Sequence, residues 1–368
     1  MDRLPIFQEA PAQAEAIWFM EGAGPQRNRA TTALITPPLV AQDRFVVGGD
    51  TALVSPIAVG GDMLFADGDH RLHAFDLADG QERWRVDLPG SFLSPALVDD
   101  TVFVRVEAGT TGALVALNRE TGAQRWSFPF PSVGSSYDNV GGHVTSPVAL
   151  PGIVVAGAAR LMMAFDAQSG AVLWQFESTE PIASSATIAD NTVYFADFTH
   201  LYALDLQTGK QRWHFTHEAV TLFFAPLIVN NTVIAVDHNT IYALTQQEGR
   251  VLWQRSFGNQ EVIPAAATSD QLYVKSVNQL WAVKAQSGEV LWNYAATNFV
   301  SLPALTAAHL YVITRSDGGS QLRTLQQKDG QEVWRSAEMP FSNSAPVAAN
   351  GAIYVRTING GIVGYRSK

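Results

Sequence analysis

The 368-residue sequence contains no cysteine. Within this chain, that absence excludes disulfide bonds, thiolate metal sites, cysteine nucleophiles and lipid attachment to cysteine. No apolar run approaches the roughly 18 residues of a membrane-spanning helix. Residues 1–16 also lack the basic start and apolar core of a signal peptide, so we expect that any leader was removed before this sequence begins.

Basic residues are scarce, with 24 Lys and Arg against 34 Asp and Glu, a formal net charge of −10. This balance disfavours nucleic acid or an anionic membrane as the main partner. The sequence has no Gly-x-Ser-x-Gly, P-loop or Rossmann glycine pattern. No local motif therefore supports a function as a hydrolase, a nucleoside triphosphatase or a dinucleotide-binding protein. Asp67-Gly68-Asp69 lacks the further ligands of a calcium loop, so we interpret it as a turn and expect no metal site.

The sequence does contain a regular repeat. Seven glycines are each followed four residues later by a tryptophan, at Gly80/Trp84, Gly122/Trp126, Gly170/Trp174, Gly209/Trp213, Gly249/Trp253, Gly288/Trp292 and Gly330/Trp334. The tryptophans lie 39 to 48 residues apart, which fits one four-stranded propeller blade of about 40 to 45 residues. Short runs of β-branched and aromatic residues fill the repeats. The pattern predicts an all-β propeller of four-stranded antiparallel blades.

Eight inner-strand starts, six of them marked by proline, stand against seven glycine–tryptophan turns, which predicts eight blades. The last blade therefore lacks its outer strand, and an open edge would leave backbone groups unpaired. Phe45 stands 39 residues before Trp84. We therefore place the closing, N-terminal strand at about residues 44–48, with Phe45 in the tryptophan slot. Trp18 then belongs to a separate N-terminal arm, residues 1–40, and the propeller domain spans residues 41–368.

The repeated Ala-Leu-Asp-x-x-Thr-Gly-x-x-x-Trp, complete at residues 203–213, resembles the repeat of pyrroloquinoline-quinone-type (PQQ-like) propellers. Trp18-Phe19-Met20-Glu21-Gly22 followed by Pro25-Gln26-Arg27 resembles the N-terminal arm of bacterial secreted proteins in this superfamily. As the resemblance implies, the dehydrogenase branch uses a vicinal cysteine pair, the quinone and calcium, and the cysteines are missing here. The chain is more similar to the non-enzymatic scaffold members, of the outer-membrane assembly propeller lipoprotein type.

One connection between units is longer than the others. Pro147 follows Trp126 by 21 positions, where most units need 11 to 13, so about ten residues are inserted. Long loops on rigid scaffolds concentrate binding residues. We predict that this loop forms a lip over the channel and touches a ligand or partner through Tyr137, Asp138, Asn139 and His143. The alternative is a glycine-rich hairpin that contacts nothing.

Basic residues come just after the second strand of four units, at Arg105, Lys275, Arg315 and Arg356. On the face that carries the long loop they would form an electropositive funnel for a carboxylate or an acidic peptide. The alternative, which we favour, is pairing with carboxylates at comparable positions of other blades, namely Asp67, Asp197 and Asp237.

Aromatic residues gather in the outer-to-inner connections, at Phe223, Phe224, Phe299 and Phe341. Exposed together, they would form an apolar patch for a protein or peptide. We favour the other arrangement, in which they plug the mouth of the channel.

These features predict a monomeric, non-catalytic binding or assembly scaffold that acts outside the cytoplasm, in the periplasm or at the cell surface. It would hold a protein, a peptide or a small ligand on one face, without a cofactor. The alternative is a quinone-dependent sugar or alcohol oxidoreductase that uses PQQ with calcium. A fold of this kind does not by itself decide between the two.

Overall fold

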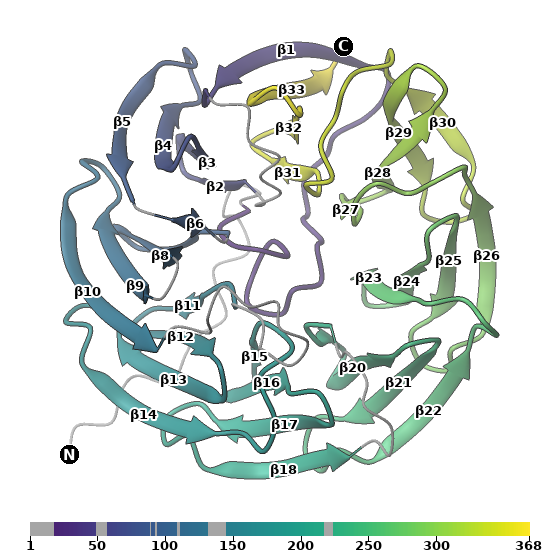
Figure 1. Ribbon diagram of the computed structural model, residues 1–368. Helices are drawn as coiled ribbons and strands as arrows, with labels where there is room; N and C mark the ends of the chain where they lie inside the picture. Colours follow the sequence, from purple (N-terminus) through teal and green to yellow (C-terminus); the bar gives the residue numbers. More distant parts are fainter. Residues whose placement is uncertain are drawn as a thin grey trace.

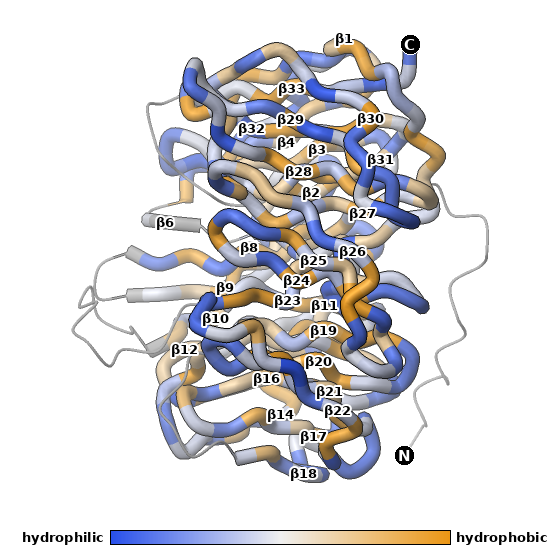
Figure 2. The backbone as a smooth tube through the Cα atoms, turned by 90° about the vertical axis from the view of Figure 1, so that its right-hand side faces the viewer, coloured by the Kyte–Doolittle hydropathy of each residue, from blue (hydrophilic) through white to orange (hydrophobic). Residues whose placement is uncertain are grey.

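The computed structural model describes residues 18–48, 57–88, 90–92, 94–108, 111–131, 145–216 and 224–368. Eight antiparallel sheets are arranged around a central axis, as Figure 1 shows. The predicted eight-bladed, all-β propeller is therefore confirmed. Figure 2 shows the blades edge-on, with hydrophilic residues in many of the turns. Among the described residues, no helix is long and apolar enough to cross a membrane.

The blades follow one another in chain order, and each runs from its innermost strand outward. Blades 1 to 4 consist of β2 (Ala58–Gly60), β3 (Met63–Gly68), β4 (Arg71–Asp76) and β5 (Glu82–Asp87); β6 (Ser91–Phe92), β7 (Ala96–Val98), β8 (Thr101–Ala108), β9 (Thr111–Asn118) and β10 (Gln124–Pro131); β11 (Val148–Leu150), β12 (Ile153–Ala158), β13 (Leu161–Asp166) and β14 (Val172–Glu177); and β15 (Thr187–Ala189), β16 (Thr192–Ala196), β17 (His200–Asp205) and β18 (Gln211–Thr216).

Blades 5 to 8 repeat this arrangement. They consist of β19 (Leu227–Val229), β20 (Thr232–Asp237), β21 (Thr240–Thr245) and β22 (Val251–Ser256); β23 (Ile263–Ala267), β24 (Gln271–Lys275), β25 (Gln279–Lys284) and β26 (Val290–Ala295); β27 (Ala304–Leu305), β28 (His309–Ser316), β29 (Gly319–Gln326) and β30 (Glu332–Arg335); and β31 (Val347–Ala349), β32 (Ala352–Arg356) and β33 (Gly361–Ser367), completed by β1 (Leu39–Val46).

Blade 4 shows why the repeated residues form these strands. Asp190 and Asn191 both have positive φ, 45° and 57°, which suits the tight turn from β15 to β16. After β17, the Asp205 carboxylate accepts hydrogen bonds from the backbone N–H and hydroxyl of Thr208, at 2.9 and 2.8 Å. Gly209 then takes φ of 66° and sends the chain back into β18.

The same glycine also closes the seam between neighbouring blades. A Cβ atom on Gly209 would lie 2.7 Å from the indole of Trp174 in blade 3, so only glycine lets the tryptophan pack there. The Trp174 indole N–H donates to the carbonyl of Leu206 at 2.7 Å. Trp213 makes the equivalent bond to Gln246 of blade 5, at 2.8 Å. Glycine and tryptophan therefore repeat together because they meet across six of the eight seams.

Strand β1 pairs antiparallel with β33, so the N-terminal part of the chain closes the ring as predicted. The expected register was wrong. Ala74 pairs with Trp84 in blade 1, whereas the equivalent Gly364 pairs with Asp43. Phe45 lies two positions later, opposite Ile362. Spacing to the next blade misled the prediction, because backbone pairing to β33 sets the register and the connection after β1 can vary in length.

Residues 18–36, here called the inner segment, run along the inner strands from blade to blade, and the purple trace through the middle of Figure 1 follows them. In six blades, the backbone N–H at one fixed position of the inner strand donates to this segment. The donors Val59, Leu97, Ile188, Ile228, Ala267 and Leu305 bond, in this order, to the carbonyl oxygens of Trp18, Phe19, Pro25, Gln26, Asn28 and Arg29. The inner segment thus satisfies backbone groups that the inner strands would leave unpaired.

The inner segment takes the place that we predicted for a phenylalanine plug. Phe299 and Phe341 are buried, but each forms a backbone bridge to a blade: Phe299 to Thr314 in β28, and Phe341 to Thr357 directly after β32. Phe341 also packs edge-on against Tyr365, with ring centroids 6.3 Å apart. The plug prediction fails for these two rings because backbone pairing holds them at their blades. Phe223 lies outside the described residues.

Candidate functional site

The basic residues predicted to form the funnel have different surroundings. Arg356 is 4% exposed and donates to both the carboxylate and the carbonyl of Asp67 in blade 1, at 2.5 and 2.7 Å. This is the carboxylate pairing that we favoured. Arg315, at the end of β28, is exposed. Lys275 is partly buried, and burial lowers the pKa of its ammonium group.

Arg105 is completely buried and has a partner that we did not foresee. It forms an ion pair with Glu107 on the same strand, and its guanidinium lies 4.3 Å from the centre of the Phe130 ring. It also donates to the carbonyl of Val106 at 2.8 Å. Burial lowers the pKa of Arg105 to about 10, although Glu107 counteracts the shift. These contacts hold the charge inside blade 2.

Asp197, another of the three carboxylates expected to pair with these basic residues, has a structural role. Its carboxylate is fully buried and accepts hydrogen bonds from the backbone N–H groups of Glu180, Thr199 and His200, at 3.0, 2.8 and 2.6 Å. The Tyr202 hydroxyl adds a fourth, at 3.0 Å. A carboxylate with this many donors is satisfied without a ligand.

The other predicted site residues, Tyr137, Asp138, Asn139 and His143, lie outside the described residues. Their role in a binding lip stays a prediction. Among the residues that the structure does describe, no group of three His, Asp or Glu side chains is placed to hold a metal ion.

A charged cluster in the inner segment was not predicted. Arg27 is 2% exposed and donates to the carbonyls of Ala186 and Ser146, at 2.6 and 3.3 Å. It forms an ion pair with Glu21 at 2.9 Å, and Arg29 lies 3.8 Å from the same carboxylate. Burial raises the pKa of Glu21, but the two guanidinium groups and their hydrogen bonds outweigh it and leave the pKa below its usual range. The cluster joins the inner segment to blades 3 and 4.

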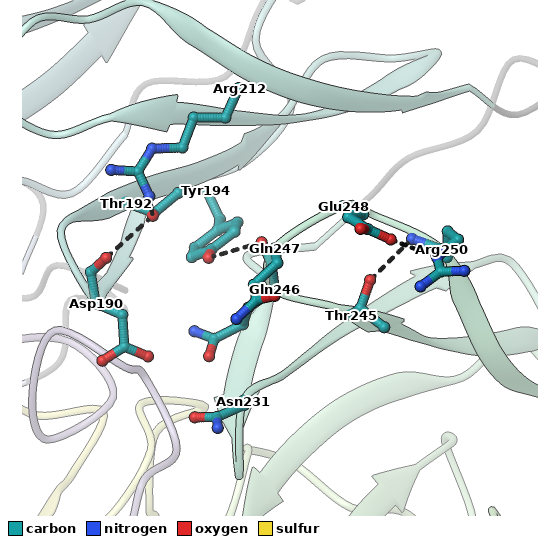
Figure 3. A pocket seen from close by; sticks show the side chains of 10 residues that line it. All are labelled: Asp190, Thr192, Tyr194, Arg212, Asn231, Thr245, Gln246, Gln247, Glu248 and Arg250. Carbon is teal, nitrogen blue, oxygen red and sulfur yellow. Dashed lines mark hydrogen bonds and ion pairs between the residues drawn. The ribbon is translucent and has the colours of Figure 1, made fainter.

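A pocket of about 600 Å³ lies at the seam between blades 4 and 5, and Figure 3 shows its side chains. Its floor is buried and its rim is exposed. All the lining residues are polar or charged: Asp190, Thr192, Tyr194, Arg212, Asn231, Thr245, Gln246, Gln247, Glu248 and Arg250. Such a lining can exchange hydrogen bonds with a ligand, and the Tyr194 ring adds apolar surface.

A second pocket, of about 430 Å³, lies where the inner segment meets blades 5 to 7. Its lining includes Gln26, Asn28 and Thr31 of the inner segment, together with Asn230 and Ser269 from the turns after the inner strands. This pocket therefore exists only because the inner segment lies along the channel wall.

The fold, the repeat and the seam together define a PQQ-type propeller. The sequence profile of the family described as outer membrane protein assembly factor BamB matches residues 30–160, 68–240, 158–261 and 237–368. Since these matches cover most of the sequence, the chain belongs to this family.

Two curated relatives match part of the chain. The serine/threonine-protein kinase AfsK of Streptomyces griseus is 30% identical over 171 residues, which is 43% of this chain and 20% of the kinase. Outer membrane protein assembly factor BamB of Yersinia pestis is 26% identical over 179 residues, which is 45% of this chain and 42% of the relative. The matches thus span about a fifth and about two fifths of the lengths of these relatives.

Solved structures share the fold at low sequence identity. BamB from Moraxella catarrhalis superposes with a TM-score of 0.69 at 17% identity, covering 90% of this chain and 98% of that one. A europium-containing methanol dehydrogenase superposes with a TM-score of 0.75 at 12% identity, covering 95% and 98%. Because scaffold and enzyme share the architecture, these likenesses show the fold alone.

Proposed function

We propose that this protein is a non-catalytic scaffold that acts outside the cytoplasm and presents one propeller face to a protein or peptide partner. Membership of the BamB family supports an assembly role of this kind. The observation that carries the proposal is the inner segment, which covers the inner strands of six blades with the chain's own backbone. Partners are therefore expected at the faces, and Arg315 is exposed at one of them. The long loop after β10 is proposed to contribute to the same face.

The same observation disfavours the quinone-dependent alternative. A cofactor chamber along the axis would compete with residues 18–29 for the inner strands, and the described residues provide no metal-binding group of three side chains. We therefore favour the scaffold over a function that uses PQQ with calcium. A titration of the purified protein with both, followed by absorbance, separates the two functions: a stoichiometric complex would contradict the scaffold proposal.

Site-specific photocrosslinking in the native cell envelope tests the scaffold proposal directly. A photoreactive phenylalanine analogue at Arg315 is expected to give one discrete crosslinked species, because this residue is exposed on the proposed binding face. The same analogue at Leu252, which is 57% exposed on the outer strand β22, is the control and should give none. Crosslinks at Leu252 but not at Arg315 would place the partner on the rim and refute the proposed face.

The long loop gives a second test of the same face. Tyr137→Ala and His143→Ala are expected to weaken the partner captured at Arg315, with thermal stability nearly unchanged, as is usual for loop residues that bind rather than pack. Binding by isothermal calorimetry and melting by calorimetry give the two readouts. If the double variant has a lower melting temperature and still binds with full affinity, the loop is structural and these residues are not part of the binding site.

A further inference from the structure

The seam pocket between blades 4 and 5 is built around a residue slot that recurs in the blades. The carbonyl of this slot accepts the indole N–H of the preceding blade's tryptophan, as at Leu206, Gln246 and Ala285. The backbone at this slot is therefore occupied in every such seam. The side chain is free to vary, and in blade 5 it is glutamine.

The Gln246 side chain differs from polar side chains in the same slot of other blades. Gln327 in blade 7 donates its amide to the carbonyl of Thr306 at 2.7 Å, and Arg119 in blade 2 donates to the carbonyl of Asp99 at 3.3 Å. Both bonds go to the first turn of the residue's own blade. Gln246 is only 7% exposed, yet its amide nitrogen has no hydrogen-bond partner among the described residues. A buried donor without a partner is costly, which points to a ligand atom at this position.

The floor of the pocket offers further hydrogen-bonding groups beside Gln246. The Tyr194 hydroxyl is buried, and its bond to the Gln246 carbonyl is long, at 3.5 Å. Asp190 stands on the rim with no ion pair in the described part of the chain, and Asn231 reaches the pocket from the other blade. Figure 3 shows these side chains gathered around one space. Carboxylate, amide and hydroxyl groups together can both donate and accept.

The charges around the pocket argue against an anionic ligand. Arg212 is held by Asp205 at 2.8 Å and by the Thr192 hydroxyl at 2.7 Å. Arg250 is paired with Glu248 at 2.6 Å. With both guanidinium groups engaged and Asp190 adding a negative charge, a phosphate or carboxylate would find no unpaired cation. The lining has no aliphatic residue and a single aromatic ring, that of Tyr194, which disfavours a peptide that relies on several apolar anchors.

We propose that this pocket binds a neutral saccharide, with the Gln246 amide donating to a sugar oxygen and the Asp190 carboxylate accepting from sugar hydroxyls. Sugars carry donors and acceptors on every ring, which matches this lining. The Tyr194 hydroxyl can form a hydrogen bond to the same sugar ring from the floor of the pocket. The site is separate from the proposed partner face, because the pocket is built from turns at the opposite ends of the second strands.

The test uses the purified full chain and three neutral probes: maltotriose, cellotriose and triacetylchitotriose. We expect at least one to bind with a Kd below about 10 mM. Gln246→Leu removes the donor but keeps the carbonyl that accepts from Trp213, and leucine already occupies this slot in blade 4 at Leu206. This variant should bind the same probe about tenfold more weakly with an unchanged melting temperature.

Gln327→Leu is the matched control, because the same residue type in the same slot has its amide satisfied within the protein. Its saccharide affinity should equal that of the wild type. Three outcomes would overturn the proposal: no probe binds, trialanine binds in their place, or Gln246→Leu binds the probe as tightly as Gln327→Leu. None of these outcomes affects the crosslinking result at Arg315, so the scaffold function is tested independently.

Discussion

Replacing Arg27 by methionine is expected to lower the free energy of unfolding by about 3 to 5 kcal/mol, the range for breaking a buried ion pair from one side. The guanidinium holds the carbonyls of Ala186 and Ser146 and the carboxylate of Glu21. Methionine fills similar volume but donates nothing. Glu21 would then keep only Arg29, at 3.8 Å, and a hydrogen bond from the Ser146 side chain. Urea denaturation followed by tryptophan fluorescence measures the loss.

The double variant Glu21→Gln/Arg27→Met separates charge from packing. Because it removes the carboxylate with its partner, it should be more stable than Arg27→Met alone. If the two are equally stable, the ion pair contributes nothing and the cost lies in the lost carbonyl contacts.

The pH dependence gives an independent check on this cluster. The pKa of folded Glu21 lies below its ordinary value, so its contribution to stability is present above the unfolded pKa, about 4.3, and is lost as pH falls through the folded pKa. The stability gap between wild type and the double variant should therefore narrow below about pH 4. A gap that is constant with pH would mean that Glu21 does not titrate differently in the folded state.

The propeller could be predicted because its signal is repeated in side chains. At six seams a glycine admits the tryptophan ring of the preceding blade, as Gly209 does for Trp174, so the same steric requirement selects the same two residues in successive units. The inner segment has no such signature. Its bonds to Val59, Leu97 and the other inner strands join backbone to backbone, so any residue type can make them. A few side chains do fix its path, namely Trp18 and Met20, which are fully buried, and Arg27, which binds blades 3 and 4.

The contacts of the candidate site residues were harder to predict, because each contact depends on which polar or charged group lies close in space. Arg105 and Glu107 are two positions apart on one strand and so share a face, a local relation that the sequence already contained. The pairing of Arg356 with Asp67 needed closure of the ring as well. Gln246 and Gln327 are the same residue in the same slot, and only the geometry of the neighbouring turn distinguishes them. A sequence pattern does not show whether a buried donor such as the Gln246 amide has a hydrogen-bond partner.

Replacing Phe45 by alanine is expected to cost about 3 to 5 kcal/mol, the range for truncating a buried phenylalanine. Although Phe45 lies two positions beyond the tryptophan register, its ring fills the seam that closes the propeller. The side chain is 2% exposed and packs against Phe75 of blade 1 and Tyr354 of blade 8, with ring centroids 5.6 and 6.1 Å apart. Its loss would leave a cavity between the first and last blades.

Val46→Ala on the same strand is the control, because Val46 is 71% exposed and its truncation should cost little. Unfolding in urea compares the free energies of unfolding of the two variants, in both of which the backbone of β1 can still pair with β33. If Phe45→Ala costs no more than Val46→Ala, backbone pairing alone closes the ring and the aromatic contact is dispensable. If the cost approaches the expected range, the closing seam relies on an aromatic ring, as the other seven do on their tryptophans, although its register differs from theirs.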